Sequence, residues 1–406
     1  MQQDVKKPLS IVFASNCYTI HQIDLSEALY RQCEGKYTFI ETVLGENQDN
    51  RYGLSTENVP FLKQYFDPAQ KAECDLLLQT ADVVLIGSAP DALIRSRLRQ
   101  NKLTFRYSER LFKEKLTLRT YPHAMASAWL HHGRYRFRPL YMLCASAFTA
   151  ADCRKFGNYR NRTYQWGYFP EKICYPSVDS LLEQKEPNKL LWCGRLIQWK
   201  HPEAALVVAR YLKDHGCSFS MDMIGDGAMQ SFLQEQIKRL GLTAEVQLLG
   251  AMPPQQVREK MEHASIFLFT SDRGEGWGAV LNEAMNSGCA VVASHAIGSV
   301  PFLLEDGKNG RIYRDGDLEE LCSKTHSLLH QPAERERLGR AAYETIQTRW
   351  NAEVAVTRFL ALAEAILRGE KKPQLFADGP CSRAEILEDA WYPPKNGRGE
   401  PKKDKR

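Results

Sequence analysis

Residues 274–285 read Gly-Glu-Gly-Trp-Gly-Ala-Val-Leu-Asn-Glu-Ala-Met, and this stretch indicates the fold of the chain around it. The apolar run 266–269 precedes it, and a second apolar run, 289–293, follows Gly288. Short, continuous apolar runs are typical of strands buried in a parallel sheet. The order is therefore strand, glycine-rich turn, helix, glycine stop and strand, which predicts an α/β unit.

The glycine-rich turn has the composition of an anion site. Three glycines in five residues allow the backbone to approach a ligand closely. A helix beginning near Ala279 would direct its N–H groups and positive end into the turn. Glu275 and Glu283 stand on either side of that helix start. Acidic residues near a helix start are also ordinary solvated residues, and at this point both interpretations stand.

Composition places the chain among globular proteins with more than one domain. It has 406 residues, of which 43% are hydrophobic and 25% charged. The sequence contains no run of 18 apolar residues, and residues 1–8 lack the apolar core of a signal peptide. Its 11 cysteines form no Cys-x-x-Cys pair, so neither a zinc site nor a disulfide framework is suggested. We expect a cytoplasmic protein, with peripheral contact at the inner face of a membrane as an option.

Positive charge is concentrated in one segment, residues 91–165. The net charge of the chain is +5, but this segment carries 16 Lys and Arg against 4 Asp and Glu, an excess of +12 that leaves −7 elsewhere. Such asymmetry indicates an anionic partner, although a solvated basic face is an equal alternative. Aromatic residues alternate with basic ones at 106–110 and 134–138, which suits sugars or lipid phosphates. Because no nucleic-acid-binding motif is present, we expect no nucleic-acid partner.

The first half of the chain alternates predicted strands with predicted helices, which indicates a parallel α/β sheet. The strands are expected at 9–14, 37–40, 82–86 and 140–146. No Gly-x-Gly-x-x-Gly follows the first strand, so a dinucleotide is not assigned to this half. The basic segment holds His123, His131 and His132 as candidate acid/base groups, and His123 is taken as the catalytic candidate.

A second α/β domain is expected after a polar, proline-bearing link at 175–188. Its first strand, 189–193, leads into a turn with two cations, Arg195 and Lys200, at the carboxyl end of the strand, where open α/β sheets bind ligands. Pro202 suits the first turn of the next helix. Asp317 suits an N-cap better than a metal site. Beyond residue 368 the chain is charged and proline-rich, and a disordered tail is expected.

Four motifs follow one another in the second half of the chain: Gly194-Arg195 with Lys200, Gly225-Asp226-Gly227, the Glu-x7-Glu of Glu275 and Glu283, and Gly298 with Pro301. With these motifs, residues 189–367 resemble the retaining glycosyltransferases of family 4, also called group 1, which have the GT-B fold of two Rossmann-like domains facing a central cleft. The segment 106–113 looks like the bacterial members that build surface polysaccharides. Ser15-Asn16-Cys17 departs from the paired glycines that many members have after the first strand.

The resemblance implies a role for each motif residue. Residues 1–180 would form an acceptor-binding domain, 187–350 a nucleotide-sugar-binding domain, 351–368 a C-terminal helix and 369–406 the tail. Sugar would pass from a nucleotide-diphosphate sugar to a saccharide or lipid-linked saccharide with retention of configuration and without a metal or separate cofactor. The implied contacts are the diphosphate with Arg195, Lys200, Gly278 and Ala279; the ribose and sugar with Glu283, Glu275, Gly276 and Trp277; and the nucleotide with Gly225, Asp226 and Gly227. Glu275 would also be catalytic, because it would lie near the anomeric carbon and stabilise its oxocarbenium-like character.

Two other functions remain open on the sequence. A different GT-B enzyme, such as an epimerase or a phosphorylase, would share the fold, although the Glu-x7-Glu with Arg195 and Lys200 favours transfer. A non-catalytic protein that binds a membrane or nucleic acid would account for the basic segment alone. Donor, acceptor and linkage are not fixed by the sequence.

Overall fold

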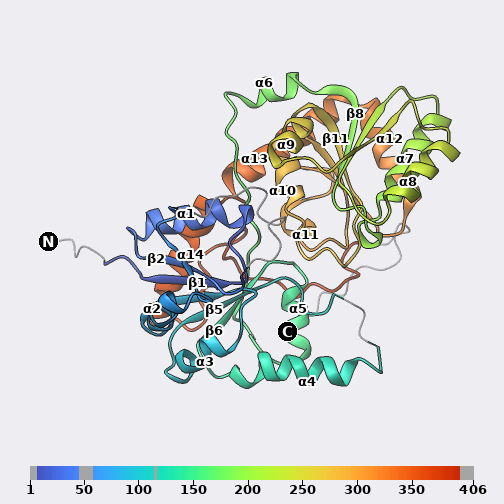
Figure 1. The fold of residues 1–406 in the computed structure, drawn as a ribbon. Coiled ribbons are helices and arrows are strands. Elements are labelled where there is room, and N and C mark those ends of the chain that lie inside the picture. The colour runs from blue at the N-terminus through green and yellow to red at the C-terminus, as the bar shows by residue number, and fades with distance from the viewer. Residues whose placement is uncertain (1–6, 45–57, 114–116, 394–406) are drawn as a thin grey trace.

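The computed structural model describes residues 7–44, 58–113 and 117–393. The chain forms two α/β domains that face one another, each built on a parallel sheet flanked by helices (Figure 1). Among the described residues, no helix is both long and apolar enough to cross a membrane. The two-Rossmann arrangement expected from the sequence is confirmed.

The first sheet has seven parallel strands in the order β3-β2-β1-β4-β5-β6-β7. Strand β1, in the interior of this sheet, is fully buried, as its apolar sequence predicts. The strands are Ile11–Ser15 (β1), Tyr37–Glu41 (β2), Leu62–Gln64 (β3), Val83–Ile86 (β4), Thr104–Ser108 (β5), Leu140–Cys144 (β6) and Thr163–Gln165 (β7). The helices around it are Ile20–Gln22 (η1), Ile23–Gln32 (α1), Pro68–Thr80 (α2), Ala92–Arg99 (α3), Tyr121–His131 (α4), Gly133–Tyr135 (η3) and Thr149–Lys155 (α5).

The second sheet has six parallel strands in the order β10-β9-β8-β11-β12-β13. They are Glu186–Cys193 (β8), Ser220–Ile224 (β9), Val246–Gly250 (β10), Ala264–Phe269 (β11), Ala290–Ser294 (β12) and Arg311–Tyr313 (β13). The helices in this half of the chain are Val178–Glu183 (α6) in the link, Gln198–Lys200 (η4), Pro202–Asp214 (α7), Gln230–Arg239 (α8), Pro254–His263 (α9), Val280–Asn286 (α10), Val300–Leu303 (α11), Leu318–His330 (α12), Pro332–Thr348 (α13) and, after the second domain, Ala352–Leu367 (α14).

Two local expectations in the second domain are confirmed. Pro202 occupies the first turn of α7, whose buried face includes Ala204, Ala205, Val208 and Leu212. The side chain of Asp317 accepts a hydrogen bond from the backbone N–H of Glu320 and so caps α12. The link expected at 175–188 contains a short helix, α6, which Figure 1 shows at the top of the molecule.

Strand β5 lies inside the basic segment, where the sequence analysis expected no strand. Phe105 is completely buried in it, and Arg106 is buried beside Asp91, with 2.6 Å between Nη2 and Oδ1. A buried arginine in a strand breaks the apolar pattern by which strands are recognised. The ion pair is what permits the charge to be buried, and it forms only in the folded chain.

The last helix, α14, returns to the first domain, although it follows the second domain in sequence (Figure 1). Phe359 packs edge-on against Phe105, with 5.0 Å between ring centroids. Gln32 of α1 donates a 3.0 Å hydrogen bond to the carboxylate of Glu353. The two domains are therefore connected by the chain twice, once through residues 175–188 and once through α14.

The prediction of a disordered tail is wrong for residues 369–393. Cys381 and Ser382 are 1% exposed, and the backbone at 381–384 hydrogen-bonds to strand β7. Trp391 then donates to the carbonyl of His295 in the second domain, over 3.0 Å. The segment is charged and rich in proline, but Cys381 is buried and the aromatic side chains of Phe376, Trp391 and Tyr392 are half-buried against the rest of the molecule. Residues 394–406 lie outside the described part of the chain.

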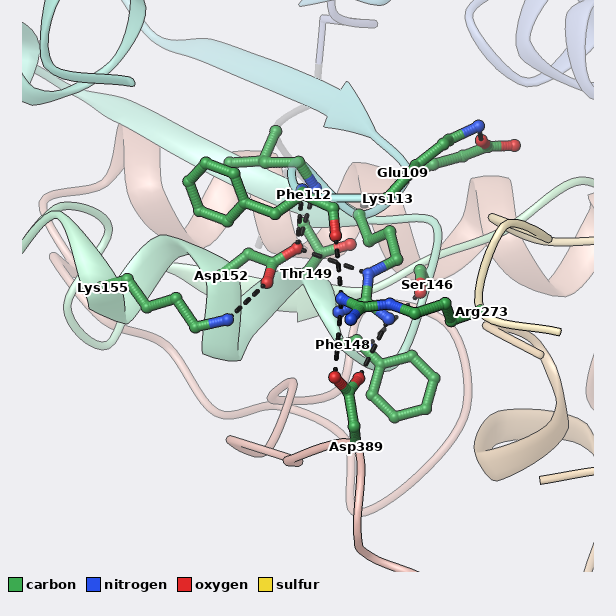
Figure 2. Close-up of polar contacts among 12 residues, drawn as sticks. Glu109, Phe112, Lys113, Ser146, Phe148, Thr149, Asp152, Lys155, Arg273 and Asp389 are labelled. Carbon is green, nitrogen blue, oxygen red and sulfur yellow. Dashed lines mark hydrogen bonds and ion pairs between the residues drawn. The ribbon is translucent and has the colours of Figure 1, made fainter. Parts of the chain in front are cut away.

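Asp389, on this C-terminal strap of residues 369–393, joins the two domains electrostatically (Figure 2). Its carboxylate lies 3.0 Å from the guanidinium of Arg110 in the first domain and 3.5 Å from that of Arg273 in the second. Arg110 is 1% exposed and also lies 3.7 Å from Asp152. Although burial alone would raise the pKa of Asp389, the two arginines lower it below the ordinary value of 3.8.

Replacing Asp389 with Asn should destabilise the protein at pH 7 by about 1–2 kcal/mol. The buried Arg110 then loses a charged partner, but Asp389 is half exposed and solvent screens the pair. Because the folded pKa is depressed, the contribution is present above pH 3.8 and is lost as the pH falls through the lower folded pKa. Urea unfolding of both proteins measures the difference. Asp378→Asn, on the same strap and paired with Arg349 alone, is the control; an equal loss there would contradict the bridging role.

Candidate functional site

A cavity of about 650 Å³ opens between the two domains at the carboxyl ends of the strands. This volume is within the range that accommodates small ligands. The second domain contributes most of its wall, from the turns after β8, β9, β10 and β11. The wall includes most of the residues predicted from the motifs, namely Arg195, Lys200, Gly225, Asp226, Glu275, Gly278, Ala279 and Glu283.

Glu275 and Lys200 form an ion pair in this cavity. Nζ of Lys200 lies 2.5 Å from the carboxylate of Glu275, and both side chains are nearly buried. The hydroxyl of Ser271 donates a further hydrogen bond of 3.0 Å to the same carboxylate oxygen. The two residues come from turns after different strands, β8 and β11, which are neighbours in the sheet. The pairing holds one anion and one cation ready on the cavity wall.

Trp199 separates the two cations of the first turn. The guanidinium of Arg195 lies 5.7 Å from the Trp199 ring centroid, and the ammonium of Lys200 lies 4.9 Å from it. Cations over an indole face are attracted by its quadrupole. Arg195 is exposed, so its side chain is able to move toward a ligand, whereas Lys200 is already fixed by Glu275.

The glycines of Gly225-Asp226-Gly227 are required by the protein backbone itself. A Cβ on Gly225 would lie 1.9 Å from the carbonyl oxygen of Gly194, and one on Gly227 would lie 2.6 Å from that of Leu196. Both glycines also have positive φ angles, 135° and 147°. The 225–227 turn therefore packs directly against the backbone of the turn that carries Arg195. Gly225 and Asp226 line the cavity, and Gly227 is placed behind them.

Gly276 and Trp277 do not line the cavity, which corrects their expected role as sugar contacts. A Cβ on Gly276 would lie 2.0 Å from the carboxylate of Glu109. The absence of a side chain at Gly276 therefore leaves room for Glu109 of the first domain. Trp277 is completely buried and packs on Trp350, with 5.8 Å between ring centroids. Its indole N–H donates to Asn282 over 2.9 Å. The sequence could not distinguish a glycine that faces a ligand from one that faces another domain.

Gly278, Ala279 and Glu283 do line the cavity, around the start of α10. Gly278 has a φ of +81° and turns the chain into this helix, whose seven residues are too few for a strong terminal dipole. Burial raises the pKa of Glu283 above its ordinary value, and the charge of Arg258 partly opposes this. A carboxylate in this environment gains from accepting hydrogen bonds.

None of the three candidate histidines of the basic segment lines the cavity. His123 is exposed on α4, which Figure 1 shows at the outer edge of the first domain, so the structure does not bring it to Glu275. His131 lies 2.6 Å from Asp91. His132 is buried with Nδ1 3.0 Å from the hydroxyl of Tyr159, and burial, aided by Arg106, lowers its pKa to about 3. These positions are structural.

His21, Glu109 and Tyr168 line the cavity instead, and the sequence analysis assigned them no role. His21 lies in η1 after the first strand, and its ring stacks on Tyr168 at 6.0 Å. Its Nδ1 has no hydrogen-bond partner among the described residues, and burial lowers its pKa. The hydroxyl of Tyr168 donates to Glu109 over 3.0 Å. The rule that ligands bind beyond strand ends would have pointed to the loop after the first strand.

His201 connects the two turns that carry Lys200 and Glu275. Its Nδ1 lies 2.8 Å from Glu203, and its Nε2 lies 3.2 Å from Asp272. The hydrogen bond to Glu203 is the main cause that raises the pKa of His201 to about 9, with Asp272 adding to it and burial opposing it. His201 is therefore charged at neutral pH, and its charge stabilises the local arrangement of the site.

Comparisons with known proteins agree with this geometry. Residues 177–345 match the family model for glycosyl transferases group 1. Solved structures share the arrangement: Anabaena HepE in complex with UDP and glucose superposes with a TM-score of 0.61 at 16% identity, covering 88% of this chain and 100% of that one. The fold is GT-B. Sucrose-phosphate synthase from Thermosynechococcus elongatus superposes with a TM-score of 0.63 at 15% identity, covering 89% and 100%.

Sequence relatives match the same part of the GT-B chain. The amylovoran biosynthesis glycosyltransferase AmsK of Erwinia amylovora is 28% identical over 205 residues, which are 49% of each chain. The putative colanic acid biosynthesis glycosyltransferase WcaL of Salmonella typhimurium is 28% identical over 174 residues, 42% of this chain and 41% of its own. The chain thus spans about half the length, or less, of these curated relatives.

Replacing His201 with Asn should reduce stability at pH 6 and have little effect near pH 10. The raised folded pKa favours the protonated form, so the contribution is full below pH 6.5 and is lost as the pH rises through about 9. Since the side chain is 34% exposed, screening limits the loss at pH 6 to about 1–2 kcal/mol. Urea unfolding at both pH values measures it. His263→Asn, at an exposed histidine, is the control; a loss at His201 that is independent of pH would contradict the assignment.

Proposed function

We propose that the chain is a retaining, metal-independent glycosyltransferase that uses a nucleotide-diphosphate sugar. The observation that carries the proposal is the convergence of Arg195, Lys200, Glu275 and Glu283 on one cavity between two Rossmann-like domains. Two cations suit a diphosphate, and two carboxylates suit sugar hydroxyls. The family match of residues 177–345 supports this chemistry. In this proposal, residues 187–350 bind the sugar donor and residues 1–180 bind the acceptor.

The diphosphate is proposed to bind between Arg195, Lys200 and the backbone of Gly278 and Ala279. Transfer leaves negative charge on the departing diphosphate, and fixed positive groups at that position lower the barrier. Lys200 is held there by Glu275 before any ligand enters. A diphosphate would draw the ammonium toward itself and leave the Glu275 carboxylate free to contact the sugar. Because two side-chain cations already face the leaving group, no metal is required in this mechanism.

The nucleoside is proposed to lie along the turns after β9 and β10. This part of the wall includes the apolar side chains of Ile224, Met252 and Val257, which suit the face of a base. Glu283 also lines the cavity, and its carboxylate would accept hydrogen bonds from the ribose hydroxyls. UDP is bound in the structure of Anabaena HepE, which has the same fold; the base used by this chain is left open.

The acceptor is proposed to enter from the first domain and to react on the face of the sugar from which the diphosphate departs, which retains the configuration. His21, Glu109 and Tyr168 are the side chains of that domain that bring polar groups to the cavity wall. His21 thereby takes the position that the sequence analysis gave to His123. Relatives named for amylovoran and colanic acid biosynthesis support a saccharide or lipid-linked saccharide acceptor in polysaccharide assembly.

Removing Glu275 or Glu283 should lower turnover by about 10²–10³-fold, as loss of a preorganised electrostatic contact does. Glu275→Ala, Glu275→Gln and Glu283→Ala would be assayed by nucleotide release from a panel of nucleotide sugars. Glu275→Gln keeps the shape of a side chain that contacts Lys200, so a folding defect is separated from a chemical one. Glu235→Ala, at an exposed position on α8, is the control. Turnover near that of the wild type in both positions would refute the site.

We further propose that α4 and its flanks attach the enzyme to an anionic membrane surface. Leu118 is 98% exposed, Phe137 84% and Trp129 55%. The exposed cations Arg119 and Arg136 are the sequence neighbours of Leu118 and Phe137. Exposed aromatic and apolar side chains next to arginines are typical of interfacial helices. The proposed membrane-binding surface is therefore α4 and its flanks, and not the whole basic segment 91–165. Phe105 is in the core, Tyr107 is partly buried, and Arg97, Arg106 and Arg110 of the basic segment are buried.

The paired substitution Trp129→Ala and Phe137→Ala should weaken binding to phosphatidylglycerol vesicles, measured by co-sedimentation. High salt should weaken it as well, because each arginine near the surface contributes only about 1 kcal/mol through a screened attraction. Phe232→Ala, which removes an aromatic ring that is 46% exposed on α8 in the second domain, is the matched control. If the wild-type protein stays in the supernatant at low salt, the membrane proposal is wrong. The basic charge would then serve to bind the acceptor.

A further inference from the structure

A cluster of metal-binding side chains lies on the second domain, outside the cavity. Cys217, in the loop between α7 and β9, faces His326 and His330 of α12, and their ligand atoms all lie within 4.8 Å of one another. His326 and His330 are four residues apart on one helix face, with 4.4 Å between ring centroids. Figure 1 shows α12 beside α7 in the second domain.

Hydrogen bonding prepares His330 for coordination. Its Nδ1 lies 3.1 Å from the backbone carbonyl of His326. A carbonyl only accepts, so Nδ1 carries the proton and Nε2 of the neutral ring keeps its lone pair. Histidines that bind metals usually have the second ring nitrogen fixed on a carbonyl or carboxylate in this way. Neighbouring His215 is held alike, with Nδ1 2.8 Å from the carbonyl of Tyr211.

A further histidine, His215, lies beside the cluster. His215 lies 5.5 Å from His326, ring centroid to centroid, so three imidazoles and one thiol are gathered at this surface.

We propose that Cys217, His326 and His330 bind a divalent transition ion of the zinc type. Sulfur and imidazole ligands select such ions over Mg²⁺ and Ca²⁺. In a tetrahedral zinc site with bonds of about 2.0–2.3 Å, neighbouring ligand atoms are separated by about 3.3–3.8 Å. Small side-chain rotations from the present separations would reach that geometry. Cys217 and His326 are half-buried and His330 is exposed, which leaves the fourth position to solvent.

The proposed ion would have a structural role and would take no part in sugar transfer. Lys200 precedes α7 and Cys217 follows it, and the 13 residues of that helix are about 20 Å long. The ion would therefore lie at the opposite end of α7 from the cavity. It would fasten the loop before β9 to α12, and turnover would not depend on it.

Zinc binding by the full-length protein tests the proposal. After treatment with EDTA and a phosphine reductant, the wild type should take up one equivalent of Zn²⁺ in competition with a chelating dye. It should also melt at a higher temperature when Zn²⁺ is present. Cys217→Ser and His330→Ala should each weaken that affinity at least tenfold and abolish the shift. With Co²⁺, a thiolate-to-metal absorption band should appear in the wild type and be absent in Cys217→Ser.

Matched variants show whether the ligands are specific. Cys174→Ser and His263→Ala change an exposed cysteine and an exposed histidine elsewhere, and both proteins should bind Zn²⁺ as the wild type does. Nucleotide release at 25 °C should be the same with and without EDTA. Failure of the wild type to bind one equivalent, or equal binding by Cys217→Ser and His330→Ala, would overturn the zinc site and would leave the proposed transferase activity untouched.

Discussion

The close approach of two glycine backbones to the first domain is the constraint on which the cleft depends. A Cβ on Gly298 would lie 1.8 Å from the carbonyl oxygen of Gly276 and 2.4 Å from the hydroxyl of Ser146. The carbonyl of Gly298 accepts a 2.8 Å hydrogen bond from the backbone of Ala147. A side chain at Gly298 would clash with the Gly276 backbone, and one at Gly276 would clash with the Glu109 side chain of the first domain. The two domains therefore touch at these glycines, beside the cavity.

Short polar contacts between adjacent turns fix the charged side chains within that cavity. The single hydroxyl hydrogen of Thr270 is shared between the backbone carbonyls of Lys200 and His201, at 2.8 and 3.0 Å, and the hydroxyl oxygen accepts from the indole N–H of Trp192. The backbone N–H of Asp272 donates to the carbonyl of Trp199 over 3.0 Å. The Lys200–Glu275 pair thus rests on two turns that are joined to each other. Such preorganisation means that little reorganisation is needed when a charged ligand binds.

The C-terminal part of the chain gives this arrangement a second connection. Helix α14 packs on the first domain, and the strap of residues 369–393 runs from it along β7 to the edge of the second domain. Asp389 then faces one arginine from each domain. Arg273 is only two residues from Glu275, so the strap reaches the turn that carries a proposed catalytic group. The strap therefore links the two domains in addition to residues 175–188.

The sequence by itself determined the two parallel α/β sheets and most of the residues on the cavity wall. Apolar strand runs, glycine turns and N-caps are local signals, and the side chains at 195, 200, 275 and 283 follow strands whose carboxyl ends meet at one edge of a sheet. Only the tertiary structure decided which domain surface faces that edge. It placed His21, and not His123, on the cavity wall, buried Gly276 and Trp277 in packing contacts, and ordered residues 369–393.

The same distinction holds for charge and for the candidate metal ligands. Arg97, Arg106 and Arg110 count as surface cations in a sequence, but each is buried against carbonyls or carboxylates supplied by distant segments. Cys217 and His326 form no spacing motif, because the loop before β9 and helix α12 meet only when the sheet between them has formed. Local patterns record what a segment does alone, whereas long-range contacts exist only after the chain has folded.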